Sequence, residues 1–227
     1  MLDPVLRRES PLPGNDYIAI EGPIGVGKTT LARLMQAQFG AQLLLEGFEE
    51  NPFLKDFYAD RARYAFQTQV FFILGRYQQQ TRALPGLLGA GPVISDYTFA
   101  KDRLFAQLNL QGDELGTYER LYSVLAENII LPDLVVYLYA DTPVLMERIA
   151  LRDRTYERNI SAEYIESLVQ AYEMFFAQYS QTAMLRLNTH ALDIVHRPVD
   201  LEEVLQRVRS ALRHGTHQMA LPQFKEL

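Results

Sequence analysis

The 227-residue chain has no cysteine, no long apolar run and no excess of basic residues. Without cysteine it can form neither a disulfide framework nor a thiolate metal site. No run approaches the roughly 18 apolar residues of a membrane span, and the charged residues Asp3, Arg7, Arg8 and Glu9 interrupt any secretory signal. We therefore expect a cytoplasmic protein.

The scarcity of positive charge narrows the class of partner. The chain has 28 acidic and 22 basic side chains, so its net charge is −6. Proteins that clamp polymeric DNA or RNA neutralise phosphates with clustered Lys and Arg, which disfavours that class here. A free nucleotide or nucleoside is the better expectation.

The sequence also lacks internal repeats and low-complexity tracts, and its length suits one α/β domain. Residues 1–16 combine three prolines with Gly14 and mixed charges, which predicts a flexible N-terminal arm. We predict a single folded domain over residues 17–213 and a C-terminal tail over residues 214–227.

The most informative feature present is the run GPIGVGKTT at residues 22–30. It fits the phosphate-loop pattern G-x-x-x-x-G-K-[ST], in which backbone N–H groups surround a polyphosphate, the lysine reaches the β- and γ-phosphates and the hydroxyl ligates Mg²⁺. The sequence therefore predicts binding of a nucleoside triphosphate with Mg²⁺. The expected loop contacts are Gly22, Ile24, Gly25, Val26, Gly27, Lys28, Thr29 and Thr30.

Short apolar runs alternate with long helical stretches along the chain. The runs cover residues 17–20, 41–45, 92–95 and 134–139, with residues 192–195 as a candidate fifth strand. Runs that are apolar throughout are typical of parallel strands covered on both faces. The alternation of strands and helices around a phosphate loop predicts an α/β protein with a doubly wound, mostly parallel five-stranded sheet surrounded by helices.

Carboxylates follow two of these predicted strands. Glu46 ends the second, with Glu49 close behind, and either could orient or deprotonate an attacking hydroxyl; a solvated acidic turn is the alternative. Asp96 ends the third, where an acid commonly holds Mg²⁺ beside the phosphate loop. Thr29 and Asp96 are therefore the predicted metal residues.

Four arginines, Arg148, Arg152, Arg154 and Arg158, fall within eleven residues after the fourth strand. A charge run is usually a solvated face. Because this one contains only Arg, whose planar guanidinium suits phosphoryl oxygens, we predict an arginine-rich lid over about residues 148–160.

One predicted helix carries amides and aromatics around residues 64–76. Such a helix is commonly core, yet Gln69, Phe72, Ile73 and Arg76 share one face, which could present an aromatic surface and two groups able to read a base. The four histidines lack convergent partners, and we assign them no metal.

Together these segments resemble the deoxynucleoside kinases, closest to the bacterial deoxyadenosine and deoxyguanosine kinases. The resemblance spans about residues 17–179 and rests on five motifs. These are GPIGVGKTT, EGFEENP (46–52), FQTQVFF (66–72) with Arg76, SDYTFAKD (95–102) and RIALRDRTYE (148–157). It implies ATP- and Mg²⁺-dependent phosphorylation of a deoxynucleoside 5′-hydroxyl by a homodimer built on a helix bundle.

The resemblance also implies roles for individual residues. Glu46 inherits the general base, although Gly47 replaces the proline that usually follows it, and Glu49 stays the runner-up. Tyr58 and Glu157 match the ligands of the 3′-hydroxyl. In the base pocket, Phe72 lies beside the base-reading Gln69, with Gln67 as the alternative if a gap is allowed. Arg76 and Asp102 match a pair found in relatives that accept purines or deoxycytidine, which favours deoxyadenosine or deoxyguanosine.

For the phosphates, the resemblance assigns contacts to Arg148, Arg152 and Arg154, with Arg152 and Arg154 as catalytic residues beside Lys28 and Glu46. Asp96 matches the acidic residue after strand three, but Tyr97 replaces the arginine that usually follows it. Phosphate stabilisation is therefore expected to depend more on the lid arginines.

Two alternatives stay open at this stage. A nucleoside monophosphate kinase of the thymidylate kinase type shares the loop, sheet and lid, but no extra cationic acceptor site is evident between residues 51 and 69. A non-catalytic nucleotide-binding regulator is the second. A regulator of this kind would have no use for a carboxylate placed as Glu46, because no hydroxyl has to attack. The chain also has no N-K-x-D guanine motif.

Overall fold

A parallel five-stranded sheet in the order β2-β3-β1-β4-β5 organises the protein. The computed structural model describes residue 12 and residues 14–214, without the side chains of Glu49 and His214. The strands are β1 (Tyr17–Glu21), β2 (Gln42–Leu44), β3 (Val93–Ser95), β4 (Leu134–Tyr139) and β5 (Ala183–Asn188). Ile18 of β1 pairs with Ile94 of β3 on one side and with Leu134 of β4 on the other, so β1 is the central strand. The predicted fold class is confirmed.

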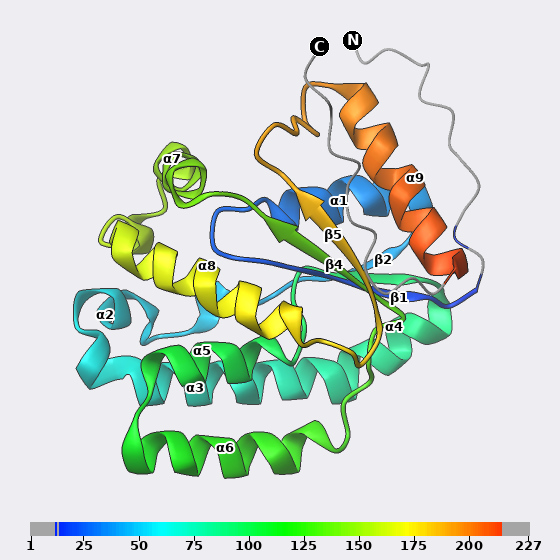
Figure 1. Cartoon of the computed structure of the whole chain (residues 1–227). Helices are drawn as coiled ribbons and strands as arrows, with labels where there is room; N and C mark the ends of the chain where they lie inside the picture. The colour runs from blue at the N-terminus through cyan, green and yellow to red at the C-terminus, as the bar shows by residue number, and fades with distance from the viewer. Residues whose placement is uncertain (1–11, 13, 215–227) are drawn as a thin grey trace.

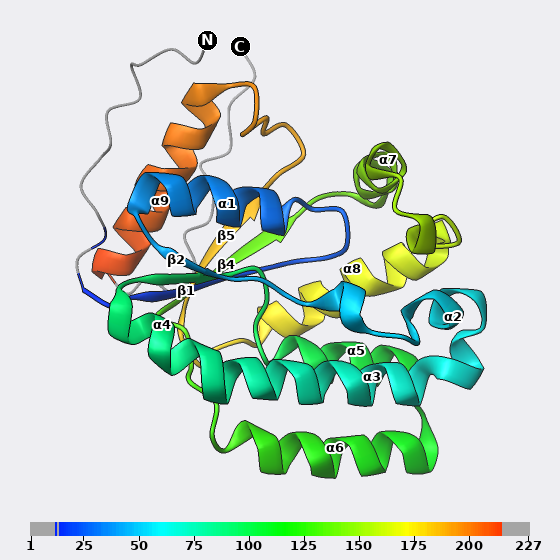
Figure 2. The same ribbon diagram turned by 180° about the vertical axis from the view of Figure 1, so that it is seen from behind.

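Helices cover both faces of this sheet. They are α1 (Lys28–Phe39), α2 (Leu54–Ala59), α3 (Arg61–Gln78), α4 (Leu84–Ala90), α5 (Lys101–Asn109), α6 (Gly112–Ala126), α7 (Thr142–Arg152), α8 (Ala162–Ala177) and α9 (Pro198–His214). Short turns η1 (Phe48–Glu50) and η3 (Thr155–Glu157) and a π-helical turn η2 (Gln79–Ala83) complete the order. Helices α1 and α9 lie on one face, α3, α5 and α8 lie on the other, and α6 packs outside α3 and α5 (Figures 1 and 2).

The core explains why the strands read as uninterrupted apolar runs. Residues Ile18, Ile20, Val135 and Val136 are almost fully buried, because helices cover the central strands on both sides. Within the described part of the chain, every helix is too short or too polar to cross a bilayer. The predicted arm and tail lie mostly outside the described residues.

The prediction of the fifth strand is wrong. Residues 192–195 instead belong to an irregular segment with a turn at residues 194–196, in which the Asp193 carboxylate accepts hydrogen bonds from the backbone of Val195 and His196. The strand is β5, whose run contains Arg186. That arginine lies over the rings of Tyr137 and Tyr139 and pairs with Glu173 at 2.6 Å, which is how an edge strand accommodates a charge. The other four predicted strands are confirmed to within one or two residues at their ends.

Candidate active site

The phosphate loop leaves β1 and ends at the N-terminus of α1. Gly22 has φ +147°, and a Cβ at this position would lie 2.2 Å from the Leu138 carbonyl oxygen, so only glycine fits. A Cβ at Gly25, where φ is +87°, would meet the Leu145 carbonyl oxygen at 2.9 Å. The sequence pattern therefore reflects both backbone conformation and close packing against the β4–α7 region, and the helix N-terminus behind the loop favours an anion.

Lys28 lies inside this loop. Its Nζ donates to the carbonyl oxygens of Gly22 at 2.7 Å and Pro23 at 3.1 Å. Burial, together with the nearby charge of Lys101, lowers the pKa of Lys28 to about 8. An anionic ligand would therefore relieve an unfavourable charge as well as contact the loop.

Thr29 and Asp96 meet where α1 and β3 come together. The Thr29 hydroxyl donates to Asp96 Oδ2 at 2.5 Å, and Asp96 Oδ1 accepts from the backbone N–H of Glu46 at 2.8 Å. A hydroxyl and a carboxylate beside a phosphate loop fit Mg²⁺, which keeps several waters and takes further oxygens from phosphates. No cluster of three His, Cys, Asp or Glu able to hold a metal occurs among the described residues.

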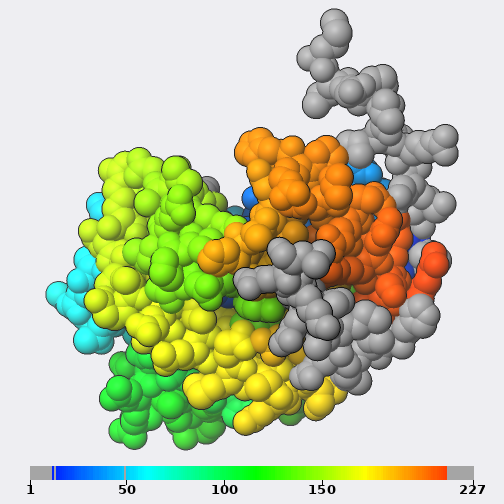
Figure 3. All heavy atoms as spheres, turned by 45° about the horizontal axis from the view of Figure 1, so that its top comes forward, coloured from blue at the N-terminus to red at the C-terminus, as the bar shows by residue number. Residues whose placement is uncertain are grey.

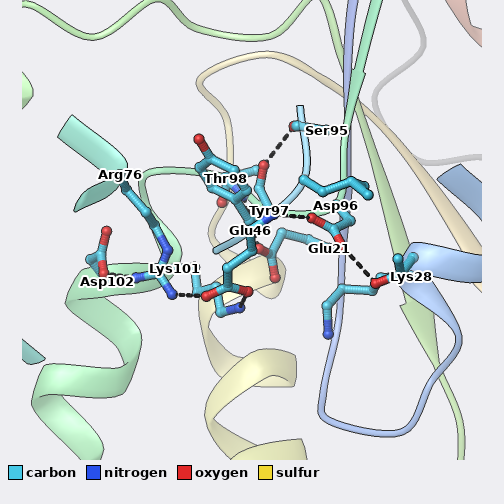
Figure 4. Close-up of polar contacts among 12 residues, drawn as sticks. Glu21, Lys28, Glu46, Arg76, Ser95, Asp96, Tyr97, Thr98, Lys101 and Asp102 are labelled. Carbon is cyan, nitrogen blue, oxygen red and sulfur yellow. Dashed lines mark hydrogen bonds and ion pairs between the residues drawn. The ribbon is translucent and has the colours of Figure 1, made fainter. Parts of the chain in front are cut away.

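Glu46 lies beyond β2 between two cations (Figure 4). One oxygen accepts from Arg76, and the other accepts from Lys101 Nζ at 2.6 Å. Burial alone would raise the pKa of Glu46, but the charges of Arg76 and Lys101 hold it well below its usual range. The carboxylate is therefore ionised and 12% exposed, as a base at the wall of a cavity would be.

Arg76 connects Glu46 with Asp102. Its second guanidinium nitrogen pairs with Asp102, and its Cζ lies 4.8 Å from the centre of the Phe72 ring. Asp102 is fully buried behind Arg76 and does not line the cavity, so it can act on a ligand there only through Arg76. The sequence spacing could not show this, because the two residues lie on different helices, α3 and α5.

A cavity of about 100 Å³ opens between Glu46 and the aromatic helix face. Gln69, which is 2% exposed, lines it from α3, whereas Gln67 is exposed on the outside of the helix. The other predicted acceptor residues on its wall are Tyr58, Phe72, Arg76, Asp96 and Glu157. Burial and the nearby phenol of Tyr164 raise the pKa of Tyr58 well above its usual value, so its hydroxyl stays neutral. The structure thus brings together the residues expected to surround a nucleoside.

The lid segment (residues 148–160) divides the four arginines into separate environments. Arg152 donates to both oxygens of Glu157, at 2.7 and 2.6 Å, and Arg154 lies over the Phe48 ring at 4.3 Å; both line the cavity. Arg148 instead donates to Thr189, and Arg158 pairs with Asp153 on the surface. The four arginines therefore do not form one cluster. Arg152 and Arg154 lie at the acceptor side, Arg148 lies elsewhere beside the phosphate loop, and Arg158 forms a solvated ion pair.

Arg148 lines a second cavity, of about 620 Å³, on the opposite side of the phosphate loop. Val26, Thr30 and residues 192–196 also line it. Figure 3 shows the surface hollowed between the yellow-green segment around α7 and the orange segment before α9. The two cavities meet at Gly25 and Arg152, which line both. Ligands bound in the two cavities would therefore meet at the phosphate loop.

Comparison with known proteins agrees with this geometry. The deoxynucleoside kinase family profile matches residues 18–213. The chain belongs to the deoxynucleoside kinase family. It is 34% identical over 201 residues to the deoxyguanosine kinase of Bacillus subtilis (strain 168), covering 86% of this chain and 97% of the relative. It is 32% identical to the deoxyadenosine kinase of Dictyostelium discoideum, covering 92% and 87%. The structure of the M. mycoides deoxyadenosine kinase with products dCMP and dCDP superposes with a TM-score of 0.75 at 26% identity, covering 86% and 98%.

Family membership decides between the alternatives left by the sequence. The protein is a deoxynucleoside kinase, an enzyme that binds deoxynucleoside and nucleotide ligands and uses ATP. A monophosphate kinase of the thymidylate kinase type and a non-catalytic regulator are both set aside.

Sequence reasoning missed Lys101. It lies inside the SDYTFAKD run without a predicted role, although its Nζ reaches Glu46 and its side chain lines the acceptor cavity. The sequence carried no signal for this pairing, because Lys101 and Glu46 lie 55 positions apart on different elements. Tyr97, which replaces the usual arginine, is fully buried and away from the cavity wall.

Proposed function

We propose that this deoxynucleoside kinase transfers the γ-phosphoryl group of ATP to the 5′-hydroxyl of a purine deoxynucleoside, deoxyadenosine or deoxyguanosine. The observation that carries the proposal is the buried Gln69 and the Arg76–Asp102 pair at the acceptor cavity, with Glu46 on the same wall. The names of the similar relatives, deoxyguanosine and deoxyadenosine kinases, support the same substrate class.

The base would be read by Gln69. It lines the cavity, and its amide carries both a donor and an acceptor for a purine edge. The Phe72 ring supplies an apolar surface for the base. Arg76 lies beside this ring at the cavity wall, and its charge is paired with Asp102. A thymine methyl placed against this ion pair would desolvate it and leave polar groups unpaired. Discrimination against thymidine follows from that cost.

The sugar would be held at the other side of the cavity. Tyr58 offers a neutral hydroxyl and Glu157 a carboxylate, both on the wall, and these suit the 3′-hydroxyl as donor and acceptor. Glu157 is in turn fixed by three hydrogen bonds from Arg152. Binding of the sugar is thereby coupled to the position of the lid segment.

The transfer itself would use the groups between the two cavities. Glu46 accepts the 5′-hydroxyl proton as that oxygen bonds to the γ-phosphorus and the bond to the β–γ bridging oxygen breaks, leaving ADP with the electron pair. Lys28, Arg152 and Arg154 stabilise the charge on the phosphoryl oxygens. Thr29 and Asp96 would hold Mg²⁺, which when bound neutralises charge on the β- and γ-phosphates. The second cavity, with Arg148, fits the adenosine part of ATP.

A panel of deoxynucleosides tests the substrate class. We expect kcat/KM for deoxyadenosine or deoxyguanosine to exceed that for thymidine by about 10- to 100-fold, since an unpaired buried polar group costs roughly 1–3 kcal/mol. In the Arg76→Met, Asp102→Ala double variant every rate should fall, because Arg76 also holds Glu46, but the ratio between purine and thymidine should narrow. Efficient thymidine phosphorylation by the wild type would contradict the purine assignment.

The lid arginines give a second prediction, with a control in the same segment. Arg152→Lys and Arg154→Lys keep the charge but lose the planar fork, and we expect turnover to fall roughly tenfold, the effect of about 1.4 kcal/mol. Arg158→Lys should leave turnover unchanged, because Arg158 is 58% exposed and paired with Asp153. Wild-type turnover in both Arg152→Lys and Arg154→Lys would remove these residues from catalysis.

We also infer a homodimer through α3 and α6. These helices pack together, and Leu74 on α3 and Val124 on α6 are 47% and 62% exposed, two apolar side chains that a second copy could cover. Sedimentation equilibrium should give the mass of two chains. A single-chain mass at micromolar concentration would contradict this inference.

A further inference from the structure

Both oxygens of Glu46 are occupied in the structure. Oε1 accepts from Arg76 Nη2, and Oε2 accepts from Lys101 Nζ at 2.6 Å (Figure 4). A general base must offer one oxygen to the hydroxyl that it deprotonates, within hydrogen-bond reach. Each oxygen keeps a second lone pair that could accept from a hydroxyl. An oxygen paired with a cation takes up a proton less readily, however, so proton transfer is favoured when one of the two cations moves away from Glu46 as the acceptor binds.

Arg76 is poorly suited to leave. It pairs with Asp102 as well as Glu46, and its Cζ lies 4.8 Å from the Phe72 ring and 5.9 Å from the Tyr97 ring. Moving it would strand the fully buried Asp102 without a counterion, which is costly. Arg76 is therefore the fixed partner of Glu46.

Lys101 is suited to leave. Glu46 is its one ion-pair partner among the described residues, and its ammonium is carried on a flexible four-carbon stem. Its Nζ also lies 5.4 Å from the centre of the Phe105 ring, a cation–π contact that holds the ammonium less strongly than the second ion pair holds Arg76. Lys101 begins α5, whose backbone need not shift for this.

The charge of the cavity indicates where the ammonium would go. Its wall carries five cationic side chains, Lys28, Arg76, Lys101, Arg152 and Arg154, and three carboxylates, Glu46, Asp96 and Glu157. This excess of positive charge fits an anion placed between Glu46 and the phosphate loop. Tyr97, fully buried beneath Arg76, contributes no cation.

We propose that Lys101 is a further catalytic residue: the 5′-hydroxyl takes its place at Glu46 Oε2, and its ammonium binds an oxygen of the transferred phosphoryl group. The inference rests on the proposed role of Glu46. As the 5′-oxygen bonds to the γ-phosphorus and the bridging oxygen leaves with ADP, the hydroxyl proton passes to Glu46. Lys101 keeps its own proton and stabilises the phosphoryl oxygens.

Three variants test the role of Lys101. Lys101→Met keeps the length of the side chain and removes the charge, and we expect kcat to fall about 100-fold, while KM for deoxyadenosine and ATP changes less than about threefold. Lys101→Ala should be equally slow but partly restored by added ethylammonium, because an untethered cation can occupy the vacated place. Arg103→Met is the matched control: it lies on the same helix, is 52% exposed and pairs with Glu119 outside the cavity, so its kcat should equal that of the wild type.

Turnover of Lys101→Met within threefold of the wild type would overturn the proposal. If Lys101→Met does not fold, as judged by thermal unfolding, the response of Lys101→Ala to ethylammonium decides: restoration supports the proposal and its absence contradicts it. Glu46→Gln in the same assay distinguishes a failure of the proposed role of Glu46 from a failure of the proposed role of Lys101. Full activity there would reject the proposed role of Glu46, whereas an inactive Glu46→Gln beside an active Lys101→Met would reject only the role of Lys101.

Discussion

Lys28→Ala is expected to abolish nearly all phosphoryl transfer while the protein still folds. The ammonium is the one cation inside the phosphate loop, counted over the described residues, and it would contact the β- and γ-phosphates as charge develops. Removing such a transition-state contact typically costs 10²-fold or more in turnover. The variant loses two hydrogen bonds to the carbonyl oxygens of Gly22 and Pro23, so only a small change in melting temperature should accompany the loss.

Turnover and thermal melting of Lys28→Ala should be measured together. Lys55→Ala is a suitable control, because Lys55 is exposed on α2 and lies outside both cavities. Retention of more than about a tenth of the wild-type turnover by Lys28→Ala would argue against this use of the loop.

Glu46→Gln should lower turnover by roughly 10²-fold or more with little change in ATP binding. The amide keeps the shape of the carboxylate but accepts no proton, and it cannot balance the charges of Arg76 and Lys101. Arg76 keeps Asp102 as its counterion, so the protein should remain folded. Turnover and ATP affinity of this variant are the measurements.

Two neighbouring carboxylates serve as comparisons for Glu46→Gln. Glu50→Gln should behave as the wild type, since Glu50 is exposed and absent from the acceptor cavity. Glu49 lies in η1, and its side chain is outside the described residues. If Glu49→Gln were more damaging than Glu46→Gln, the alignment of the base along the sequence would be wrong by three residues.

The fold was largely predictable because parallel strands buried on both faces leave short apolar runs that periodicity detects. The phosphate loop added fixed backbone positions, of which Gly22 is the clearest, since a Cβ would meet Leu138. The fifth strand was missed because Arg186 interrupts its run, and only the packing of that arginine over Tyr137 and Tyr139 shows how it is accommodated.

The candidate site was predictable where it depends on strand ends and helical spacing. Glu46 and Asp96 follow adjacent parallel strands, so their backbones had to meet at one edge of the sheet. Helical periodicity also separates Gln69, which is buried, from the exposed Gln67. These parts of the site follow from local structure.

Other parts of the site depend on where the chain turns and on long-range pairing. Helix α7 ends at Arg152, and Asp153 adopts a left-handed conformation with φ 47°, so Arg154 and Arg158 no longer follow the spacing set by Arg148. The contact of Lys101 with Glu46 joins residues 55 positions apart. Whether two such residues meet depends on the directions of their side chains in the folded protein, and a single sequence does not give these directions.

Single-turnover transfer of a labelled γ-phosphoryl group from ATP to deoxyadenosine, measured for the wild type and Glu46→Gln side by side, tests the central claim most directly. The account predicts label on the 5′-oxygen of deoxyadenosine, formed at least about 10²-fold faster by the wild type. Equal rates in the two proteins, or label released only as inorganic phosphate, would contradict it.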